Sequence, residues 1–518
     1  MKMNKILSML ALLLLTTVAL AQKYTMEDVG RYSLRDAGTI MEGNVIKGYF
    51  YFYYTEKTSR KTANYQIVVL DNNLKETASE TIEESRYVSM LEASYNGVSV
   101  LFKFYDTKEK KVYYRTMDEN GRISNKEERD ANKYETAAYV QSLSKELKNA
   151  NVNSVSKDYF VDMYTFKDKG YTYKMDCIDN EGVLAWSYTA DAAKGVNTGG
   201  YLASNKDRIL ILEANSKSIL SRDYTFKIVS VDMRGEKEYE FDLNTSKYNL
   251  LPHNAVISDN GETTLLGEYY DIKEKSMKSE SLGVFVRKVD SNGETISDNF
   301  ISWSKDISAK LTPAQRKEVR SYSIYFHNIE ITSTGDIIAI GEQFKKQVSA
   351  GGTALKMLGN MSGAVSTSAS NFEIKIGDMF MITLNSDATL KNVDVIEKLP
   401  RRVNAGEGYG LVSKHLLAKL MDAEGYFDYS FTQTNEDKSI VSIGYTEKNR
   451  EKGKIFGTTK FNVITYAAGD SEPSVDNVEF ETEATDMRIS PAKPGYLLIS
   501  EYFKKSNTVE LRLEPINF

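Results

Sequence analysis

The chain has 518 residues, with 72 acidic and 66 basic side chains and a formal net charge of −6. Proteins that bind nucleic acid carry clustered positive charge, and this balance argues against that class. At this length the chain can form several ordinary domains or one large repeat fold. Its single cysteine, Cys177, allows no internal disulfide, and we predict that it is a buried apolar residue on a strand.

The first 21 residues have the pattern of a secretory signal peptide. Two lysines precede an almost wholly apolar run, residues 6–15, and the segment ends with Ala-Leu-Ala at 19–21, which places alanine at the two positions that a signal peptidase reads. The apolar run is too short to span a bilayer, and no later segment approaches that length. We therefore expect an exported protein, periplasmic or extracellular, whose mature chain begins at Gln22. Because the residue after the cut is not cysteine, we expect no lipid anchor.

An alternating strand followed by a turn of Asp, Asn or Gly recurs along the chain. In chain order the copies are YQIVVLDNN at 65–73, VYYRTMDENG at 112–121, YKMDCIDNEG at 173–182, FKIVSVDMRG at 226–235, VFVRKVDSNG at 284–293, MFMITLNSDA at 379–388, FNVITYAAGD at 461–470 and VELRLEPINF at 509–518. A second apolar strand precedes the copies, and shorter strands come before and after this pair. The repeating unit is therefore four antiparallel strands over about fifty residues.

Four-stranded units at this period are typical of a β-propeller. We therefore predict an all-β chain, a β-propeller of four-stranded antiparallel blades, with eight blades favoured over seven because eight copies are present. A single propeller domain at 22–518 would follow the signal peptide at 1–21. The last copy ends at Phe518 without a fourth strand. We expect residues 22–34 to supply it, which would join both ends of the chain in one blade.

The strand rhythm and the signal segment together resemble those of uncharacterised secreted β-propeller-like proteins of Gram-negative bacteria, a family known only as a domain of unknown function. The resemblance covers nearly the whole mature chain, implies the propeller fold and carries over no site residue. Two better-known propeller classes do not fit. The chain has two tryptophans, so the repeated WD dipeptide is missing, and the segment DNGET at 259–263 lacks the closing tryptophan of an Asp-box.

The long insertions are expected on one rim, because the second-to-third loops of a blade and the connections between blades share that side. They lie near 131–150, 304–324, 348–371 and 401–424. Helices are predicted at 131–150, 311–320 and 411–421, and the second of them has Thr312 as its N-cap with Gln315 three residues later. The Gly-, Ser- and Met-rich insertion at 348–371 is predicted to form a mobile flap, and the alternative is a disordered linker. Loops on a rigid scaffold often carry binding surfaces, so we expect the ligand on this rim.

Four residues are candidates for ligand binding. His253 and His327 occupy equivalent places, just before the first strand of successive units, and each is followed by Asn. Arg401 and Arg402 precede a glycine-rich segment and would hold an anionic ligand. No histidine lies within zinc-ligand spacing of another His or Cys, so we expect neither a metal nor a cofactor. No nucleophile or catalytic pair can be recognised, and the catalytic residues stay unknown.

These features favour an exported binding or interaction propeller rather than an enzyme. We expect a monomer that recognises a protein or a polysaccharide through its loop-bearing rim, with no nucleic-acid partner and no membrane span. The alternative is a hydrolase or lyase that acts on a polysaccharide or a peptide-like substrate with carboxylates in the central funnel. Two carboxyl groups roughly 5–10 Å apart at the channel mouth would favour the enzyme.

Overall fold

The computed structural model of the chain describes residues 22–30, 36–42, 45–145, 151–168, 170–191, 195–218, 224–273, 281–348, 372–404, 414–448 and 459–516. The predicted signal peptide, and the predicted flap apart from Val348, lie outside the described residues. Contacts divide the chain into two compact units. Unit 1 comprises Met1–Ile40, Ile46–Arg86 and Thr482–Phe518, and unit 2 comprises Met41–Val45 and Tyr87–Glu481. The single domain at 22–518 stays a prediction.

Unit 1 contains two four-stranded antiparallel sheets among its described residues. One sheet has the order β2 (Ala37–Glu42), β3 (Val45–Lys57), β4 (Thr62–Asp71) and β5 (Glu76–Ser85). The other has the order β1 (Lys23–Met26), β33 (Thr508–Pro515), β32 (Tyr496–Phe503) and β31 (Asp486–Pro491). Because Lys23 is paired with Arg512 and Met26 with Val509, a segment near each end of the chain lies in one sheet. The predicted closing strand from residues 22–34 is confirmed.

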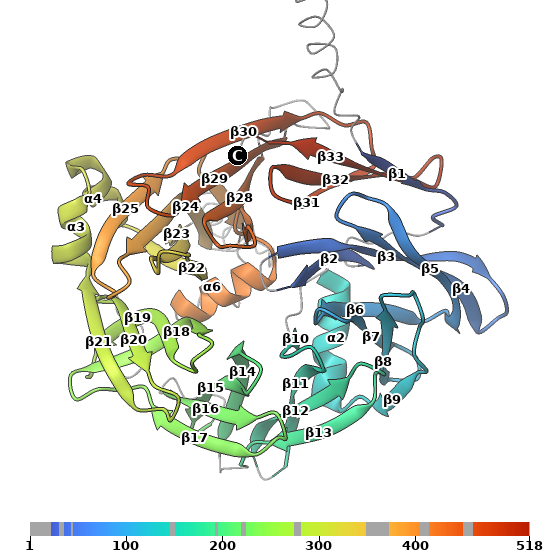
Figure 1. The fold of residues 1–518 in the computed structure, drawn as a ribbon, viewed down its shortest axis with the longest axis horizontal. Helices are drawn as coiled ribbons and strands as arrows, with labels where there is room; N and C mark the ends of the chain where they lie inside the picture. The colour runs from blue at the N-terminus through green and yellow to red at the C-terminus, as the bar shows by residue number, and fades with distance from the viewer. Residues whose placement is uncertain are drawn as a thin grey trace, which may run out of the picture. The chain divides into compact units, whose positions relative to one another are not determined.

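Unit 2 contains six four-stranded units in its described residues (Figure 1). The first three are β6 (Val88–Tyr95), β7 (Ser99–Asp106), β8 (Lys111–Asp118) and β9 (Glu127–Asp130); β10 (Val152–Ser154), β11 (Tyr159–Lys167), β12 (Tyr171–Asp179) and β13 (Leu184–Thr189); and β14 (Val196–Ser204), β15 (Arg208–Ser216), β16 (Thr225–Asp232) and β17 (Lys237–Asp242). The other three are β18 (Tyr248–Ile257), β19 (Thr263–Asp271), β20 (Gly283–Val289) and β21 (Thr295–Ser302); β22 (Ser323–Ile331), β23 (Ile337–Val348), β24 (Phe372–Leu384) and β25 (Leu390–Ile396), with the added strand β26 (Arg401–Asn404); and β27 (Tyr429–Thr434), β28 (Ile440–Lys448), β29 (Thr459–Ala467) and β30 (Ser474–Phe480).

Each four-stranded unit is an antiparallel sheet of the kind that forms a propeller blade. The first strands of successive blades in unit 2 lie beside one another, β14 beside β18 and β18 beside β22. Two blades of unit 2 also meet through one parallel pair, Tyr171 with Val196. The predicted fold class, an all-β propeller of four-stranded antiparallel blades, is confirmed, with eight blades in the described residues of the two units.

The recurring turn has a simple physical cause. In the segment VFVRKVDSNG, the side chain of Asp290 accepts hydrogen bonds from the backbone N–H groups of Asn292 and Glu294, at 2.8 and 2.9 Å. Gly293 adopts a φ of +88°, which glycine tolerates without the steric cost that other residues meet. The same aspartate-to-backbone bonds close four other third-to-fourth turns, at Asp71, Asp118, Asp179 and Asp232.

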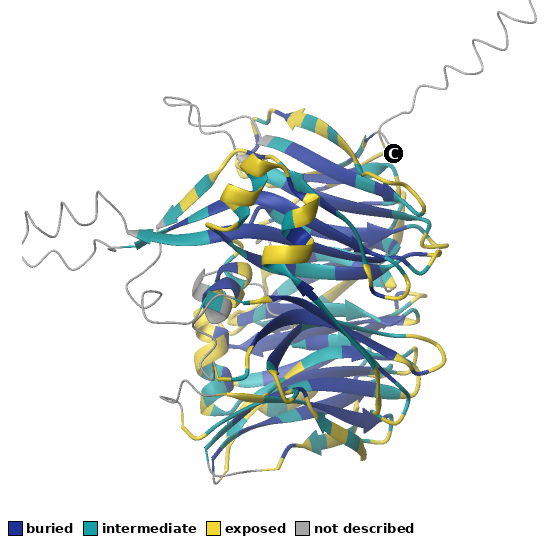
Figure 2. Ribbon diagram, turned by 90° about the vertical axis from the view of Figure 1, so that its left-hand side faces the viewer, coloured by how far each residue is buried: buried dark blue, intermediate teal, exposed yellow. Residues whose placement is uncertain are grey.

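The described helices of unit 2 all connect the end of one blade to the first strand of the next. They are α2 (Lys133–Lys145), η2 (Trp303–Ile307), α3 (Ser308–Lys310), α4 (Pro313–Val319) and α6 (Lys414–Ala423). Thr312 and Gln315 form the predicted capping box of α4. Because strands alternate in direction, these connections lie on the same rim of unit 2 as the second-to-third loops, as predicted. Exposed residues gather on turns, on helices and along fourth strands such as β5 and β17, whereas second strands such as β7 and β19 are buried (Figure 2).

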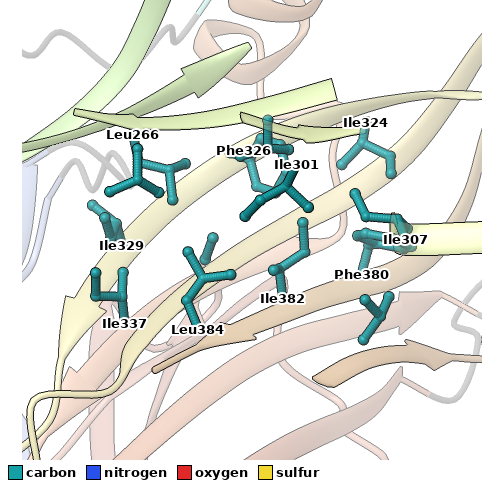
Figure 3. Close-up of a cluster of buried hydrophobic side chains, with 14 of the residues drawn as sticks. Leu266, Ile301, Ile307, Ile324, Phe326, Ile329, Ile337, Phe380, Ile382 and Leu384 are labelled. Atoms are coloured by element: carbon teal, nitrogen blue, oxygen red, sulfur yellow. The ribbon is translucent and has the colours of Figure 1, made fainter. Parts of the chain in front are cut away.

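A hydrophobic cluster fills the space between the blade of β18–β21 and the blade of β22–β25 (Figure 3). Leu266 and Ile301 come from the first blade and Phe326 from the second. Ile307 of η2 and Leu311 also belong to the cluster, so the helical connection is anchored on this core. Burial of each such side chain contributes about 1.5–3 kcal/mol. The connection is therefore a fixed part of the rim.

Candidate functional site

Two successive blades of unit 2 place a histidine at the same structural position. His253 lies in β18 and His327 in β22, and each is the extra residue of a β-bulge in the first strand of its blade. A glycine of the second strand, Gly267 or Gly341, is paired with the residue before the bulge. A bulge turns a side chain away from the regular alternation of its strand. The histidines lie inside the strand rather than before it as predicted, because the ladder continues past the bulge.

The second strand needs glycine beside this bulge. A Cβ atom on Gly267 would stand 2.0 Å from the carbonyl oxygen of Leu251 and 2.6 Å from the Cα atom of Pro252. Both atoms belong to the backbone of β18, so any other residue would push the two strands apart. The next side chain along β19 is Glu268, whose Oε2 atom lies 3.2 Å from Nε2 of His253.

In the blade of β22–β25 the corresponding histidine and glutamate, His327 and Glu342, belong to a buried ionic cluster. Nε2 of His327 lies 3.5 Å from Oε2 of Glu342, and Nδ1 lies 3.3 Å from Oδ1 of Asp422 on α6. Nζ of Lys398 lies 3.0 Å from Oε1 of Glu342 and also contacts Asp428. The Glu342 carboxylate further accepts hydrogen bonds from two successive backbone N–H groups at the start of β27. Opposite charges and N–H donors therefore surround this carboxylate.

The charges of this cluster set the protonation of its members. Burial opposes ionisation of Glu342, but Lys398 and His327 outweigh it and lower the pKa of that carboxyl. Burial likewise disfavours the imidazolium form of His327, but Asp422 and Glu342 outweigh it and raise the pKa of the imidazole above 6.5. A carboxylate at each ring nitrogen thus favours the cationic form of His327.

Protonation of His327 is expected to stabilise the fold, because the folded state raises the pKa of this side chain. The contribution is fully present below the unfolded-state pKa of about 6.5 and is lost as the pH rises through the higher folded-state pKa. We therefore expect His327→Gln to destabilise the protein more at about pH 5 than at about pH 9. Urea unfolding of both proteins at both pH values measures the difference. A loss of stability that does not change with pH would contradict the prediction.

The blade of β18–β21 surrounds its glutamate with a histidine and hydroxyl groups. Besides His253, the hydroxyls of Tyr270 and Ser281 contact the Glu268 carboxylate as donors, at 3.2 and 2.6 Å. The indole N–H of Trp303 donates to Oγ of Ser281 at 2.8 Å. Among the described residues, no lysine or arginine side chain contacts this carboxylate.

A cavity of about 200 Å³ lies beside this glutamate. Residues of β18, β19, β22 and β23, of the connection from η2 to α4 and of α6 line it, so it lies on the rim that carries the helices. The lining includes five Tyr, Trp or Phe residues and three basic residues: Tyr270, Trp303, Tyr322, Tyr325 and Phe344, with Arg316, Arg320 and Lys414. Apolar walls with a few polar groups are typical of small-molecule sites.

One hydroxyl of the lining is left without a hydrogen bond. Tyr322 is 7% exposed, and its buried hydroxyl has no hydrogen-bond partner among the described residues. A buried hydroxyl without a partner costs about 1–3 kcal/mol.

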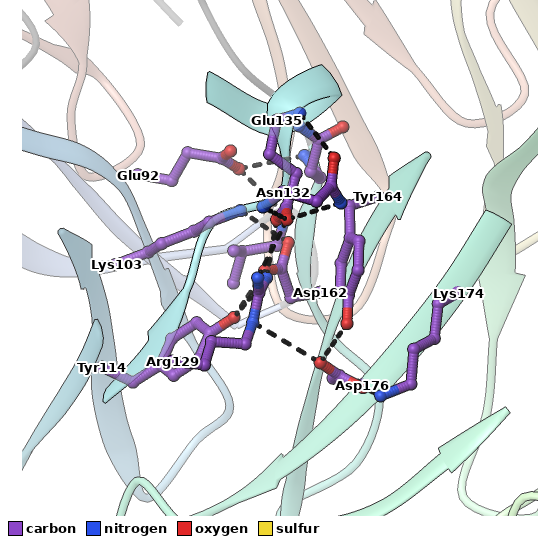
Figure 4. Close-up of polar contacts among 12 residues, drawn as sticks. Glu92, Lys103, Tyr114, Arg129, Asn132, Glu135, Asp162, Tyr164, Lys174 and Asp176 are labelled. Carbon is purple, nitrogen blue, oxygen red and sulfur yellow. Dashed lines mark hydrogen bonds and ion pairs between the residues drawn. The ribbon is translucent and has the colours of Figure 1, made fainter. Parts of the chain in front are cut away.

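A second buried ionic cluster joins the blades of β6–β9 and β10–β13 (Figure 4). Nζ of Lys103 lies 2.7 Å from Oδ1 of Asp162, and both side chains are fully buried. The hydroxyl of Tyr114 donates to Asp162 at 2.6 Å. Nη2 of Arg129 lies 2.8 Å from Glu135 on α2 and 3.5 Å from Asp162. Each of these charges already faces an opposite charge, so the cluster holds two blades and a helix together.

The four residues predicted from the sequence do not gather at one place. Among the described residues, the cavity lining includes His253 and none of the other three. His327 belongs to the ionic cluster next to it. Nη1 of Arg401 lies 3.1 Å from a carboxylate oxygen of Asp428, and Nη1 of Arg402 lies 3.0 Å from one of a glutamate. Each arginine therefore faces an acid, and binding of an anionic ligand by this pair stays a prediction.

Sequence reasoning missed the residues that surround the cavity carboxylate. A signal for Glu268 exists, because GEYY at 267–270 and GEQF at 341–344 occupy equivalent places in successive second strands. No local signal joins Ser281 and Trp303 to it, since the first precedes β20 and the second follows β21. Their proximity depends on how three strands and a helical connection assemble.

Three further observations concern the described residues as a whole. Nowhere among them do three His, Cys, Asp or Glu side chains form a group that could hold a metal ion. None of the described helices has the length and apolarity that crossing a bilayer requires. The hydrolase or lyase hypothesis, the exported location and the monomeric state stay predictions.

The WD40 domain of SCAP from fission yeast is similar at 9% identity over 95% of this chain and 98% of that one, with a TM-score of 0.37. The β-propeller domain of the Trilobed protease from Pyrococcus furiosus is similar at 11% identity over 73% and 97%, with a TM-score of 0.32. Likenesses this distant do not bear on function, and the curated proteins contain no match. The sequence matches one family over residues 1–517, and the chain therefore belongs to the family of unknown function DUF6770.

Proposed function

We propose that this protein is an exported binding protein that takes a small molecule, or the end of a polymer or protein chain, into the cavity beside Glu268. The observation that carries the proposal is the cavity itself, about 200 Å³ with aromatic walls and a nearly buried carboxylate. A pocket of this composition binds the apolar body of a ligand by contact and orients it through a few hydrogen bonds.

The position of the cavity supports a binding role. Its walls come from two blades whose shared hydrophobic cluster fixes them, and from helical connections on the rim of unit 2. Arg316 and Arg320 belong to the lining and are exposed, so solvent reaches part of it. A rigid scaffold with polar groups on its connections keeps a site preformed, which reduces the entropy lost on binding.

The two tryptophans of the chain provide a direct test. Trp303 lines the cavity, whereas Trp186 lies in β13 of another blade. A bound ligand should change the emission of Trp303. We therefore expect a screen of small molecules, glycans and peptides against the purified chain from Gln22 onward to find ligands by fluorescence titration.

The same two positions supply the matched control. For any ligand found, Trp303→Phe should abolish the fluorescence change, and Trp186→Phe should retain it with the same midpoint. Calorimetric titration checks that the emission reports binding. A ligand whose signal survives in Trp303→Phe but disappears in Trp186→Phe would place the site elsewhere and overturn the proposal.

A further inference from the structure

Two equivalent carboxylates in neighbouring blades have different surroundings. Glu268 and Glu342 each follow the glycine beside the bulge, and each contacts the bulge histidine. Glu342 also contacts Nζ of Lys398 and two backbone N–H groups. Among the described residues, Glu268 has only hydroxyl groups besides its histidine, and it borders the cavity.

The lysine of one blade corresponds to a tryptophan in the other. The last pairs before the third-to-fourth turns are Val289 with Thr295 and Leu384 with Leu390. Lys398 lies eight residues after Leu390, and Trp303 lies eight residues after Thr295. The blade of β22–β25 therefore has the ammonium group of Lys398 at this position. The blade of β18–β21 has the ring of Trp303 and a cavity instead.

We propose that the cavity binds a small molecule that carries an ammonium group and a carboxylate group. The ammonium group of the ligand would contact the Glu268 carboxylate in the way that Nζ of Lys398 contacts the Glu342 carboxylate. This inference rests on the proposed function and specifies its ligand. A nearly buried carboxylate gains most from a charged donor, because solvent screens that pair only weakly. The ligand would thus complete a cluster that the neighbouring blade forms internally.

The aromatic walls suit the same group. The Tyr270 hydroxyl donates a hydrogen bond to Glu268, and the Trp303 indole N–H donates one to Ser281. Both aromatic side chains also line the cavity. The faces of Trp and Tyr rings attract cations through their quadrupole, most strongly when water is excluded. An ammonium group beside Glu268 therefore meets a carboxylate and aromatic rings together.

The basic residues of the lining account for the second group. Arg316, Arg320 and Lys414 line the same cavity as Glu268, the one acidic residue among its described lining residues. A ligand with positive charge alone would be repelled by these three side chains, whereas a carboxylate at its other end would be attracted to them. The cavity volume of about 200 Å³ exceeds that of a cavity that holds benzene, about 150 Å³, and suits a chain of about nine heavy atoms.

Three probes of equal chain length test the proposal: 6-aminohexanoate, hexanoate and hexylamine. Fluorescence titration of Trp303 and calorimetry on the full mature chain measure the three affinities. We expect 6-aminohexanoate to bind about ten- to hundredfold more tightly than either probe that lacks one charged group. Hexanoate or hexylamine binding as tightly as 6-aminohexanoate would overturn the proposal.

A pair of variants assigns the ammonium to its partner. Glu268→Gln should remove the preference for 6-aminohexanoate over hexanoate, and Glu294→Gln, an exposed residue of the same blade, should keep it. Circular dichroism checks that both variants fold. If Glu268→Gln does not fold, the three probes on the unchanged protein decide. A preference that persists in folded Glu268→Gln would overturn the assignment.

The outcome also separates this inference from the proposed function. If the wider screen finds ligands that act through Trp303 while 6-aminohexanoate does not bind, the ammonium ligand is refuted and the binding role stands. If neither the screen nor any of the three probes gives binding, both are refuted.

Discussion

Replacing Lys103 with methionine is expected to destabilise the fold by about 3–5 kcal/mol. Nζ of Lys103 lies 2.7 Å from Asp162, and both side chains are fully buried. Burial opposes the charge on this lysine, but Asp162 and Glu92 outweigh it and raise the pKa of Lys103, so the side chain is a cation. Methionine fills a similar volume but leaves the Asp162 carboxylate without its nearest cation where water cannot replace it.

Urea unfolding followed by circular dichroism measures this loss, and the chain offers a matched control. Lys111 of the same blade contacts Glu128, and the two side chains are 38% and 39% exposed. Solvent screens such a pair, so Lys111→Met should cost far less stability than Lys103→Met. Equal losses in the two variants would show that the buried cluster does not stabilise the blades as described.

Substitution of Gly267 by alanine is the second change with a large expected effect. The added Cβ atom would stand 2.0 Å from the Leu251 carbonyl oxygen, and backbone atoms cannot rotate away as a side chain can. Overpacking costs about 1–3 kcal/mol, and we expect the upper part of that range because the ladder between β18 and β19 must shift. The shift would also move Glu268 from His253, so any ligand of the cavity should be lost.

Gly200 provides the control for this variant. It lies in strand β14, and a Cβ atom there would meet nothing within 4 Å. Gly200→Ala should therefore be neutral or stabilise the protein by up to about 1 kcal/mol, since alanine loses less conformational entropy on folding. Thermal and urea unfolding compare the two. A Gly267→Ala protein as stable as Gly200→Ala would mean that the two strands are not held at the described separation.

The blades could be predicted from the sequence because their signals are local. The turn at Asp290 forms through bonds to residues two and four positions later, so its pattern is contained in one short segment. The helix that begins at Pro313 was predicted because its capping residues, Thr312 and Gln315, are three positions apart. Even the closing strand could be inferred, since a copy that ends after three strands leaves an unpaired edge.

The candidate site could not be predicted in the same way. Glu268, Ser281 and Trp303 come from three different segments, and only the assembled blade brings their polar atoms within hydrogen-bond distance. The distinction between Glu268 and Glu342 depends on Lys398, which lies 56 positions from the nearer of them in sequence. A histidine repeated in two units indicates structural equivalence, but its partners decide whether it lines a cavity or a closed ionic cluster.

The sheet that pairs β1 with β33 constrains the order of events during biosynthesis. Roughly 480 residues separate these strands, and at about 5–20 residues per second a ribosome needs about 25–100 s to make them. Throughout that time the partner of β1 does not yet exist. The sheet of β1 and β31–β33 is therefore completed only after β33 has been synthesised. Until β33 has been made, the chain lacks the hydrogen bonds and the burial that this pairing adds.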